Sequence, residues 1–148
     1  MIRKKDIYNS DSSLTGTHQV RIRFNECDPL GIVWHGNYIK YFEDGREAFG
    51  EQHGISYLDV QSHGFATPII KTATEHKLTL KYGDTATIKT TFVNTAAAKM
   101  IFRYEIFNEA GKLACSGETV QVFIDTEGNL QLTNPLFYEQ WKQKVGLL

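Results

Sequence analysis

One segment with helical periodicity stands among segments that alternate like β-strands, and this switch of period constrains the fold most. From Asn37 to His53 apolar side chains recur every three or four residues, with charged side chains at most other positions. Gly54 follows as the expected C-cap. Gly45, in mid-helix, costs about 1 kcal/mol relative to alanine, which indicates a close contact with a sheet. The pattern predicts an α+β chain with helices on one side of an antiparallel sheet.

The remaining chain predicts five strands, because its segments alternate or are rich in β-branched residues. These segments are His18–Phe24, Thr67–Leu80, Thr85–Val93, Lys99–Phe107 and Lys112–Asp125. Pro68 predicts an edge position for the start of the second strand. Asn134 is the expected N-cap, and Pro135 the first residue, of a short terminal helix. Residues 1–16 read as a polar lead-in, and 17–148 as a single domain.

Composition excludes several classes of protein. The chain has 148 residues, 41% of them hydrophobic, with 16 Lys and Arg against 17 Asp and Glu. Such a chain can bury a core, and its near-neutral charge argues against a nucleic-acid partner. It contains no secretory signal and no apolar run of the roughly 18 residues that span a membrane. Two distant cysteines, Cys27 and Cys115, predict neither a disulfide framework nor a zinc ribbon. We therefore expect a cytoplasmic protein.

Standard catalytic motifs are absent from the sequence. It contains no G-x-S-x-G elbow, no HExxH, no Walker loop and no GxGxxG. The five histidines form no close pair in the sequence, so we expect no metal and no cofactor.

The informative segment runs from Phe24 to Tyr38 and leads into the long helix. It joins an acidic turn at Asp28 to the helix start, where backbone N–H groups lack intrahelical acceptors and carry partial positive charge. If the loop doubles back, the Asp28 carboxylate lies beside an oxyanion-binding helix end, which is a workable site for acyl transfer. The alternative is structural, because an Asp before a proline often only starts a turn.

A family resemblance is carried by the segment Asp28-Pro29-x-Gly31-Ile32-Val33-x-His35-x-Asn37-Tyr38, with Phe42 and Arg46 following. It resembles the 4-hydroxybenzoyl-CoA thioesterase family of hotdog-fold acyl-CoA thioesterases. Tyr82-Gly83-Asp84 and Gly117-Glu118-Thr119-Val120 also fit, so the resemblance covers about residues 18–125. It implies a hotdog fold, in which a five-stranded antiparallel sheet wraps around one long helix.

The resemblance also implies roles for individual residues. Asp28 matches the catalytic carboxylate, as general base or nucleophile, and the backbone N–H at His35 matches the group that polarises the thioester carbonyl. The His35 side chain would orient water or substrate. Residues expected to contact substrate are Gly31, Val33, Trp34, Asn37, Tyr38 and Phe42. Hotdog relatives form dimers with sites between subunits, so we expect a homodimer or homotetramer.

The family commonly places Arg or Lys on the turn before the fourth strand to hold CoA phosphates. Here that turn, residues 94–98, has no basic residue, and Lys99 is the remaining candidate. This departure keeps acyl carrier protein open as an alternative donor to CoA.

Two functions apart from hydrolysis also stay open. A non-catalytic acyl-binding hotdog protein would not depend on Asp28. A dehydratase or isomerase would need a His/Asp or His/Glu pair that is not found here in the usual order. Glu43 or Asp44 could be a second carboxylate on the helix, whereas Arg46 and Glu47 read as a solvated face or a dimer contact.

Overall fold

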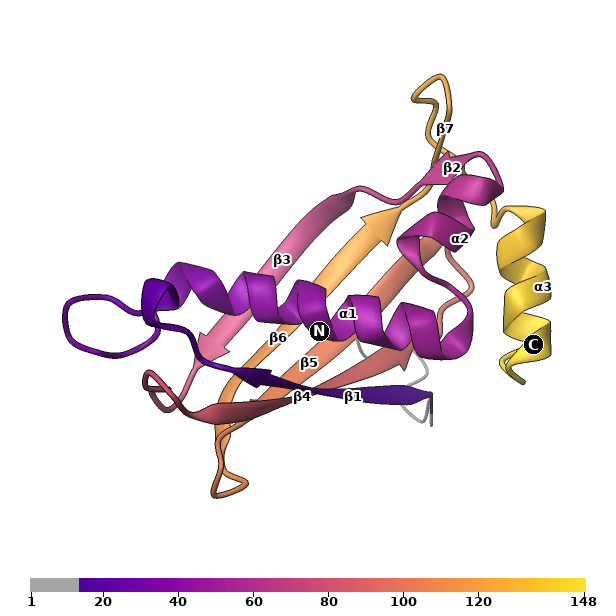
Figure 1. Ribbon diagram of the computed structural model, residues 1–148. Helices are drawn as coiled ribbons and strands as arrows, with labels where there is room; N and C mark the ends of the chain where they lie inside the picture. The colour runs from indigo at the N-terminus through magenta and orange to yellow at the C-terminus, as the bar shows by residue number, and fades with distance from the viewer. Residues whose placement is uncertain (1–13) are drawn as a thin grey trace, which may run out of the picture.

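A curved sheet with one long helix across its inner face forms the body of the computed structural model, which describes residues 14–148 (Figure 1). The elements in chain order are β1 (Thr15–Arg21), α1 (Tyr38–His53), α2 (Tyr57–Ser62), β2 (Phe65–Ala66), β3 (Ile69–His76), β4 (Thr85–Val93), β5 (Lys99–Phe107), β6 (Leu113–Val122), β7 (Ile124–Asp125) and α3 (Leu136–Lys144). The predicted α+β class is confirmed. Most of the predicted lead-in, residues 1–13, lies outside the described residues.

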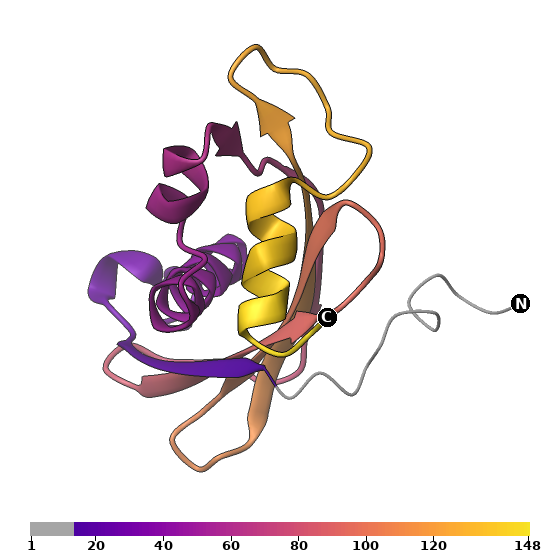
Figure 2. The same cartoon turned by 90° about the vertical axis from the view of Figure 1, so that its right-hand side faces the viewer.

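The five long strands form one antiparallel sheet in the order β1-β4-β5-β6-β3. Figure 2 shows the sheet curving around α1, while α3 stands at one end of it. The strands β1 and β3 are the edges, and nearly every residue of β3 is exposed. The predicted edge position of this strand is therefore confirmed.

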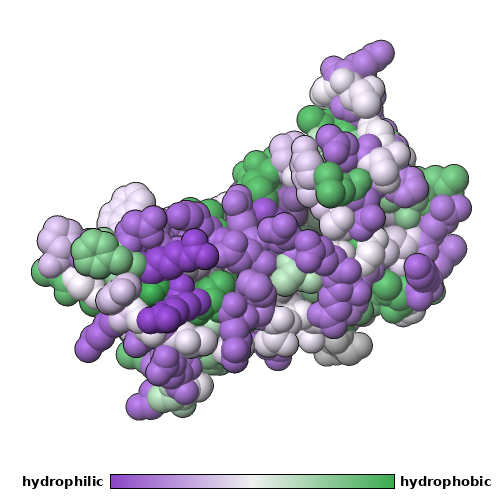
Figure 3. Space-filling model, in the orientation of Figure 1, coloured by the Kyte–Doolittle hydropathy of each residue, from purple (hydrophilic) through white to green (hydrophobic). Residues whose placement is uncertain are grey.

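The core lies between α1 and the inner face of the sheet. On the inner strands β4 and β5 the alternating inward residues are buried, as the alternation predicts: Ala86, Ile88, Thr90 and Phe92 on β4, and Met100, Phe102, Tyr104 and Ile106 on β5. The α1 side chains Tyr41, Phe42 and Phe49 are 1%, 0% and 0% exposed and pack against them. Figure 3 shows the opposite, outward side of α1 covered largely by hydrophilic residues. This helix is therefore amphipathic, as its period predicts.

Two glycines allow α1 to approach the sheet closely. A Cβ at Gly45 would lie 2.6 Å from both Ile88 Cγ2 and Thr90 Oγ1, so the predicted close contact is confirmed. On β6, a Cβ at Gly117 would lie 2.4 Å from the ring of Phe42. Each side of the interface thus contains one position that only glycine fills without displacement.

The first strand is shifted relative to its predicted bounds. It begins at Thr15, inside the predicted lead-in, and ends at Arg21. Phe24 instead enters a single 3-10 turn, Phe24–Glu26, in which the Arg23 N–H donates to Glu26 Oε1 at 2.8 Å. Phe24 is 78% exposed, and its ring meets Tyr82 edge-on with centroids 5.8 Å apart. The alternation of polar and apolar residues predicted a longer strand because it carries no information about this local capping bond.

The second predicted strand is shorter than expected, and the fifth is divided into β6 and β7. The chain leaves the sheet after His76, where the N–H groups of Lys77 and Leu78 both donate to Ala114 O. Short segments at the other end, β2 and β7, pair with each other as a separate two-stranded sheet. The helix α2 was not predicted, although Ser56 and Asp59 cap its first turn reciprocally.

The terminal helix begins one residue later than predicted. Pro135 occupies the N-cap, and its carbonyl accepts from the N–H groups of Tyr138 and Glu139. The predicted cap, Asn134, makes no such bond, and its buried Oδ1 accepts no hydrogen bond from residues 14–148. The extended ψ of 148° at Pro135 moves the helix start past Asn134. No helix within residues 14–148 is long and apolar enough to span a bilayer.

Candidate active site

The segment before α1 folds back on itself as a tight hairpin with Asp28 at its turn. The Asp28 N–H donates to Ile32 O at 2.8 Å, and the Gly31 N–H donates to Asp28 O at 2.9 Å. Gly31 has a φ of 78°, which favours glycine. Asp28 Oδ1 accepts from the Leu30 N–H at 2.8 Å. Asp28 therefore does start a turn, as the structural alternative predicts.

That structural role occupies only part of the Asp28 carboxylate. The side chain is half-buried, and its Oδ2 accepts no hydrogen bond from any residue within 14–148. A carboxylate can accept about four hydrogen bonds over its two oxygens. Asp28 can therefore cap its turn through one oxygen and still present the other to water or substrate.

Backbone bonds fix this hairpin against the sheet and the helix start. The Val33 N–H donates to Leu80 O at 2.8 Å, and the Trp34 N–H donates to Glu26 O at 3.0 Å. The Asn37 side chain donates to the same Glu26 oxygen through Nδ2 at 2.8 Å. Val33 is 4% exposed. Within this chain Val33 and Asn37 hold the loop, and their substrate contacts stay predictions.

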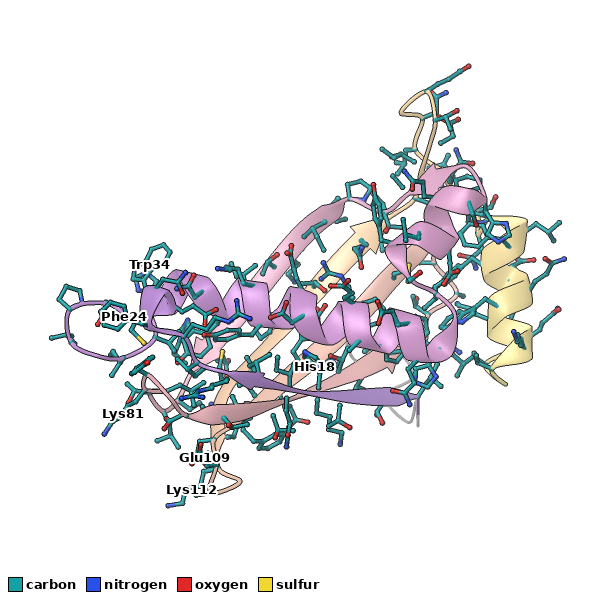
Figure 4. All side chains as sticks on the ribbon, in the orientation of Figure 1. His18, Phe24, Trp34, Lys81, Glu109 and Lys112 are labelled. Carbon is teal, nitrogen blue, oxygen red and sulfur yellow. The ribbon has the colours of Figure 1, made fainter. Side chains whose placement is uncertain are left out.

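The start of the helix presents unused backbone donors. A single 3-10 turn, His35–Asn37, leads into α1. Within residues 14–148 the N–H groups of His35 and Gly36 donate to no acceptor, as expected at a helix N-terminus. The Trp34 ring fills the space beside Gly36, where a Cβ would lie 2.2 Å from a ring carbon. The helix end is thus reached past a half-exposed indole, which Figure 4 shows at the same end of α1 as Phe24.

A second histidine lies beside the helix start, and the sequence did not point to it. His76, at the end of the edge strand β3, has its ring centroid 6.5 Å from that of His35 and 5.0 Å from that of Tyr38. The sequence carries no signal for this neighbour because it lies some forty positions away on another element. His76 therefore joins His35 as an ionisable group at this end of the molecule.

Two of the aromatic residues expected to contact substrate lie in the core. Tyr38 and Phe42 are 3% and 0% exposed, and the Phe42 ring stacks on Tyr104 with centroids 4.6 Å apart. Both side chains therefore belong to the core of this chain. Phe42 is fully buried between α1 and the sheet in this chain, and its contact with substrate stays a prediction.

The candidate phosphate ligand does not join the site within one chain. Lys99 begins β5, and its carbonyl accepts from the Tyr138 hydroxyl of α3 at 3.1 Å. The Asp28 loop lies at the opposite end of the sheet (Figure 1). Lys99 could therefore meet that loop only through another copy of the chain.

A part-buried polar chain runs from α1 into the sheet and corrects the prediction of a solvated face for Arg46, whereas a dimer contact there stays a prediction. Its guanidinium Nη1 donates to Tyr104 Oη at 3.0 Å, and that hydroxyl bonds Thr119 Oγ1 at 2.6 Å. Since arginine only donates, the Tyr104 hydroxyl accepts from Arg46 and keeps its own proton available for the bond with Thr119. The Arg46 side chain is 19% exposed, whereas Glu43, 3.9 Å away, is 62% exposed. Arg46 is thus not a solvated surface residue.

The ionisable groups near the loop limit which side chains there could act as nucleophile or hold a metal ion. Burial, with the charges of Glu26 and Asp28, raises the pKa of the Cys27 thiol, so this cysteine stays protonated at neutral pH and is a poor nucleophile. Burial also raises the pKa of the Asp44 carboxyl. Among residues 14–148, no three His, Cys, Asp or Glu side chains are placed to hold a metal ion. Asp28 stays the carboxylate that the sequence predicts for catalysis.

Comparison with known proteins shows the family to which the chain belongs. The family model of the thioesterase-like superfamily matches residues 22–143. YneP of Bacillus subtilis, provisionally named an acyl-CoA thioesterase, is 31% identical over 74% of this chain and 79% of its own. The 4-hydroxybenzoyl-CoA thioesterase of a Pseudomonas species is 25% identical over 76% of this chain and 84% of its own.

Solved structures place the fold in the same group. The DHNA-CoA thioesterase of Staphylococcus aureus superposes with a TM-score of 0.81 at 27% identity, covering 89% of this chain and 91% of that one. The predicted hotdog fold, family and thioester hydrolase class are thereby confirmed. The chain belongs to the thioesterase-like superfamily.

Proposed function

We propose that the protein hydrolyses acyl-CoA thioesters to the free acid and CoA, with Asp28 as the catalytic carboxylate. One observation carries the proposal: a carboxylate with a free oxygen stands on a hairpin that folds back before a helix start with two unused N–H donors. The acyl-CoA thioesterase names of the relatives support CoA as the donor.

Thioester hydrolysis requires few catalytic groups. The thioester carbonyl would accept from the His35 N–H, so that the oxyanion forming on that oxygen meets the positive end of α1. One preorganised donor of this kind is worth roughly 3–4 kcal/mol. A thiolate with a parent pKa near 8.5 leaves without much protonation. Metal or cofactor chemistry is not required by this route.

Asp28 can act in either of two ways. As a general base it removes a proton from water, whose oxygen attacks the carbonyl carbon while the C–S bond breaks. As a nucleophile its oxygen attacks directly and forms a mixed anhydride, which water then hydrolyses. In both routes His35 would orient water or substrate, and the proximity of His76 adds a second imidazole beside it. Hydrolysis in ¹⁸O-labelled water under single-turnover conditions identifies the anhydride route when water attacks the Asp28 carbonyl of the anhydride, because the label then appears in Asp28, which the general-base route never labels.

Acyl carrier protein is the second candidate donor, and the turn between β4 and β5 favours it. Residues 94–98 contain no basic side chain to hold CoA phosphates. The same acyl group presented on CoA and on acyl carrier protein discriminates the two by the ratio of kcat/KM values. A large preference for the carrier protein would replace CoA in the proposal.

We further propose a homodimer or homotetramer in the cytoplasm. The free edge β3 exposes a row of backbone donors and acceptors, which is a liability in a monomer. Exposed apolar side chains lie on this strand, at Ile69 and Ile70, and on α2, at Tyr57 and Leu58. Cys27 and Cys115 are free thiols, which fits a reducing compartment. Light scattering after gel filtration should give a multiple of 16.8 kDa at micromolar concentration, and a monomer there would contradict the assembly.

Replacing Asp28 with asparagine tests the catalytic proposal. The variant keeps the side-chain oxygen that caps the turn but loses the basic and nucleophilic carboxylate. We expect it to fold and to release no thiol from acyl-CoA above background. A non-catalytic acyl-binding protein would show no turnover even in the wild type.

A further inference from the structure

A pocket of about 460 Å³ lies between α1, α2 and the inner face of the sheet, away from the Asp28 loop. Its floor is apolar and includes Ile55, Val60, Met100 and Phe102. Such a volume with an apolar floor suits part of a small organic ligand. The sequence did not indicate this pocket, because α2, which closes one side, was not predicted.

The wall of the pocket contains one buried polar side chain with an unused acceptor. Gln121, on β6, is 7% exposed and lines the pocket beside Met100. Its Nε2 donates to Thr67 O at 2.8 Å and to Thr67 Oγ1 at 3.1 Å. Its Oε1 is buried and accepts no hydrogen bond from residues 14–148. Buried polar atoms in proteins are rarely left unpaired, so this wall lacks a donor.

A small rotation can offer this oxygen to a ligand. The terminal torsion of glutamine is broad, without the sharp wells of an aliphatic torsion. A donor that enters the pocket can therefore engage Oε1 while the rest of the side chain stays packed.

The charges at the pocket mouth decide what kind of donor enters. Three carboxylates, Glu43, Glu47 and Glu51, line the α1 side against the single cation Arg46. Arg46 is already engaged with the Tyr104 hydroxyl. An acidic mouth disfavours carboxylate and phosphate groups, so the pocket does not suit the nucleotide part of CoA. It suits a neutral group that donates a hydrogen bond and is carried on an apolar stem.

We propose that this pocket binds the far end of the acyl group and that Gln121 selects acyl groups ending in a hydroxyl. The inference rests on the proposed function, because the acyl group is the apolar part of the thioester. Glu43, on the rim, follows His35 by eight positions, which corresponds to about 12 Å along a helix axis. The acyl stem lies on the apolar floor, and its terminal hydroxyl donates to Gln121 Oε1.

Direct binding tests the pocket without catalysis. The probes are hexanol and its isostere methyl pentyl ether, which differ in the hydroxyl donor, titrated into isotopically labelled protein and followed by NMR at pocket residues. We expect hexanol to bind the wild type about fivefold more tightly than the ether, the effect of one neutral hydrogen bond. Gln121→Met should abolish this preference. Thr67→Val removes one partner of Nε2 but leaves Oε1, so the preference should persist.

Several binding results overturn the proposal. These are an ether that binds the wild type as tightly as hexanol, a preference that survives in Gln121→Met, and probes that perturb no pocket residue. If Gln121→Met does not fold, loss of the preference in Thr67→Val would assign the effect to local packing and overturn the role of Oε1. Retention of the preference in that variant supports it.

Kinetics test whether the pocket belongs to the substrate. The matched pair is ω-hydroxydecanoyl-CoA and ω-methoxynonanoyl-CoA, whose acyl groups have the same length. The wild type should favour the hydroxyl substrate about fivefold in kcat/KM, and Gln121→Met should show no preference. Equal rates despite selective alcohol binding overturn the acyl assignment. Absence of hydrolysis of every thioester instead refutes the proposed function, and the binding result distinguishes the two failures.

Discussion

Gly45→Ala should stabilise the fold if α1 stands clear of the sheet at that position, and destabilise it if the two are in contact. Helix propensity alone predicts that alanine in mid-helix stabilises the fold by about 1 kcal/mol. In the structure, however, the new Cβ would lie 2.6 Å from Ile88 Cγ2 and 2.6 Å from Thr90 Oγ1. Both atoms belong to branched side chains that are 0% exposed, so neither can swing away. Overpacking of this kind costs typically 1–3 kcal/mol.

Overpacking of about 1–3 kcal/mol against a propensity gain of about 1 kcal/mol leaves a net loss of about 0–2 kcal/mol for Gly45→Ala. For a chain of this size a loss at the upper end of that range lowers Tm by roughly 4–8 °C. Urea unfolding followed by circular dichroism measures it, at one fixed protein concentration because subunit association shifts apparent stability. Ala48→Gly, on the same helix, is the control and should lose about 1 kcal/mol through propensity alone. A Gly45→Ala protein that is more stable than wild type would refute the close contact.

Three further predictions address buried polar groups. Tyr104→Phe removes the hydroxyl that Arg46 bonds and should lower the free energy of unfolding by about 2 kcal/mol, measured by urea unfolding. Cys115 is fully buried and its burial raises the pKa to about 11, so native protein should release at most one equivalent of chromophore from Ellman's reagent, slowly and through Cys27, until denaturant exposes the second thiol. Burial lowers the pKa of Lys142 below 10.5, so the unfolded chain binds more protons between the two values and stability should rise with pH there. Lys142→Met should remove that rise.

Each of these has a clear contrary outcome. An unchanged unfolding midpoint in Tyr104→Phe would mean that the Arg46 bond adds nothing to stability. Rapid reaction of both thiols in native protein would contradict the burial of Cys115. For Lys142 the free energy of unfolding is measured against pH in wild type and Lys142→Met, and the difference is taken so that other alkaline titrations cancel. A difference that does not change with pH would contradict the cost of burying that amine.

Features that repeat along the chain were predictable, because periodicity reports which face of an element is buried. The inward face of β4, from Ala86 to Phe92, and the course of α1 follow from alternation and helical spacing. Gly45 was also readable, because a costly glycine in mid-helix needs a compensating contact. The hotdog arrangement itself came from family resemblance, since periodicity alone does not order the strands.

Features that depend on one local bond were not predictable from periodicity. Phe24 continues the alternation of the first strand, yet the Glu26 side chain captures the Arg23 N–H and turns the chain out of the sheet. The helix α2 had a readable signal, the capping pair Ser56 and Asp59, but it is too short for a periodic pattern.

The features of the candidate site also fall into those that the sequence could predict and those that it could not. The Asp28 hairpin directly precedes the helix start in the sequence, so both features could be expected from turn residues and the onset of helical spacing. His76, the buried Arg46–Tyr104 bond and the Gln121 pocket join residues from separate elements. Such contacts follow from strand order and register, which no single segment contains.

The central claim is that the Asp28 carboxylate performs chemistry beyond starting its turn, and the protein contains a matched control. Asp84 also caps a turn, accepting from the Lys81 N–H at 2.9 Å, as Asp28 accepts from Leu30 at 2.8 Å. Asparagine preserves an acceptor oxygen at either position. The decisive measurement is kcat for thiol release from a panel of short, long and aromatic acyl-CoA substrates, in Asp28→Asn and Asp84→Asn side by side. The account predicts a loss of at least about a hundredfold in Asp28→Asn and near wild-type turnover in Asp84→Asn, whereas equal turnover in both variants would contradict it.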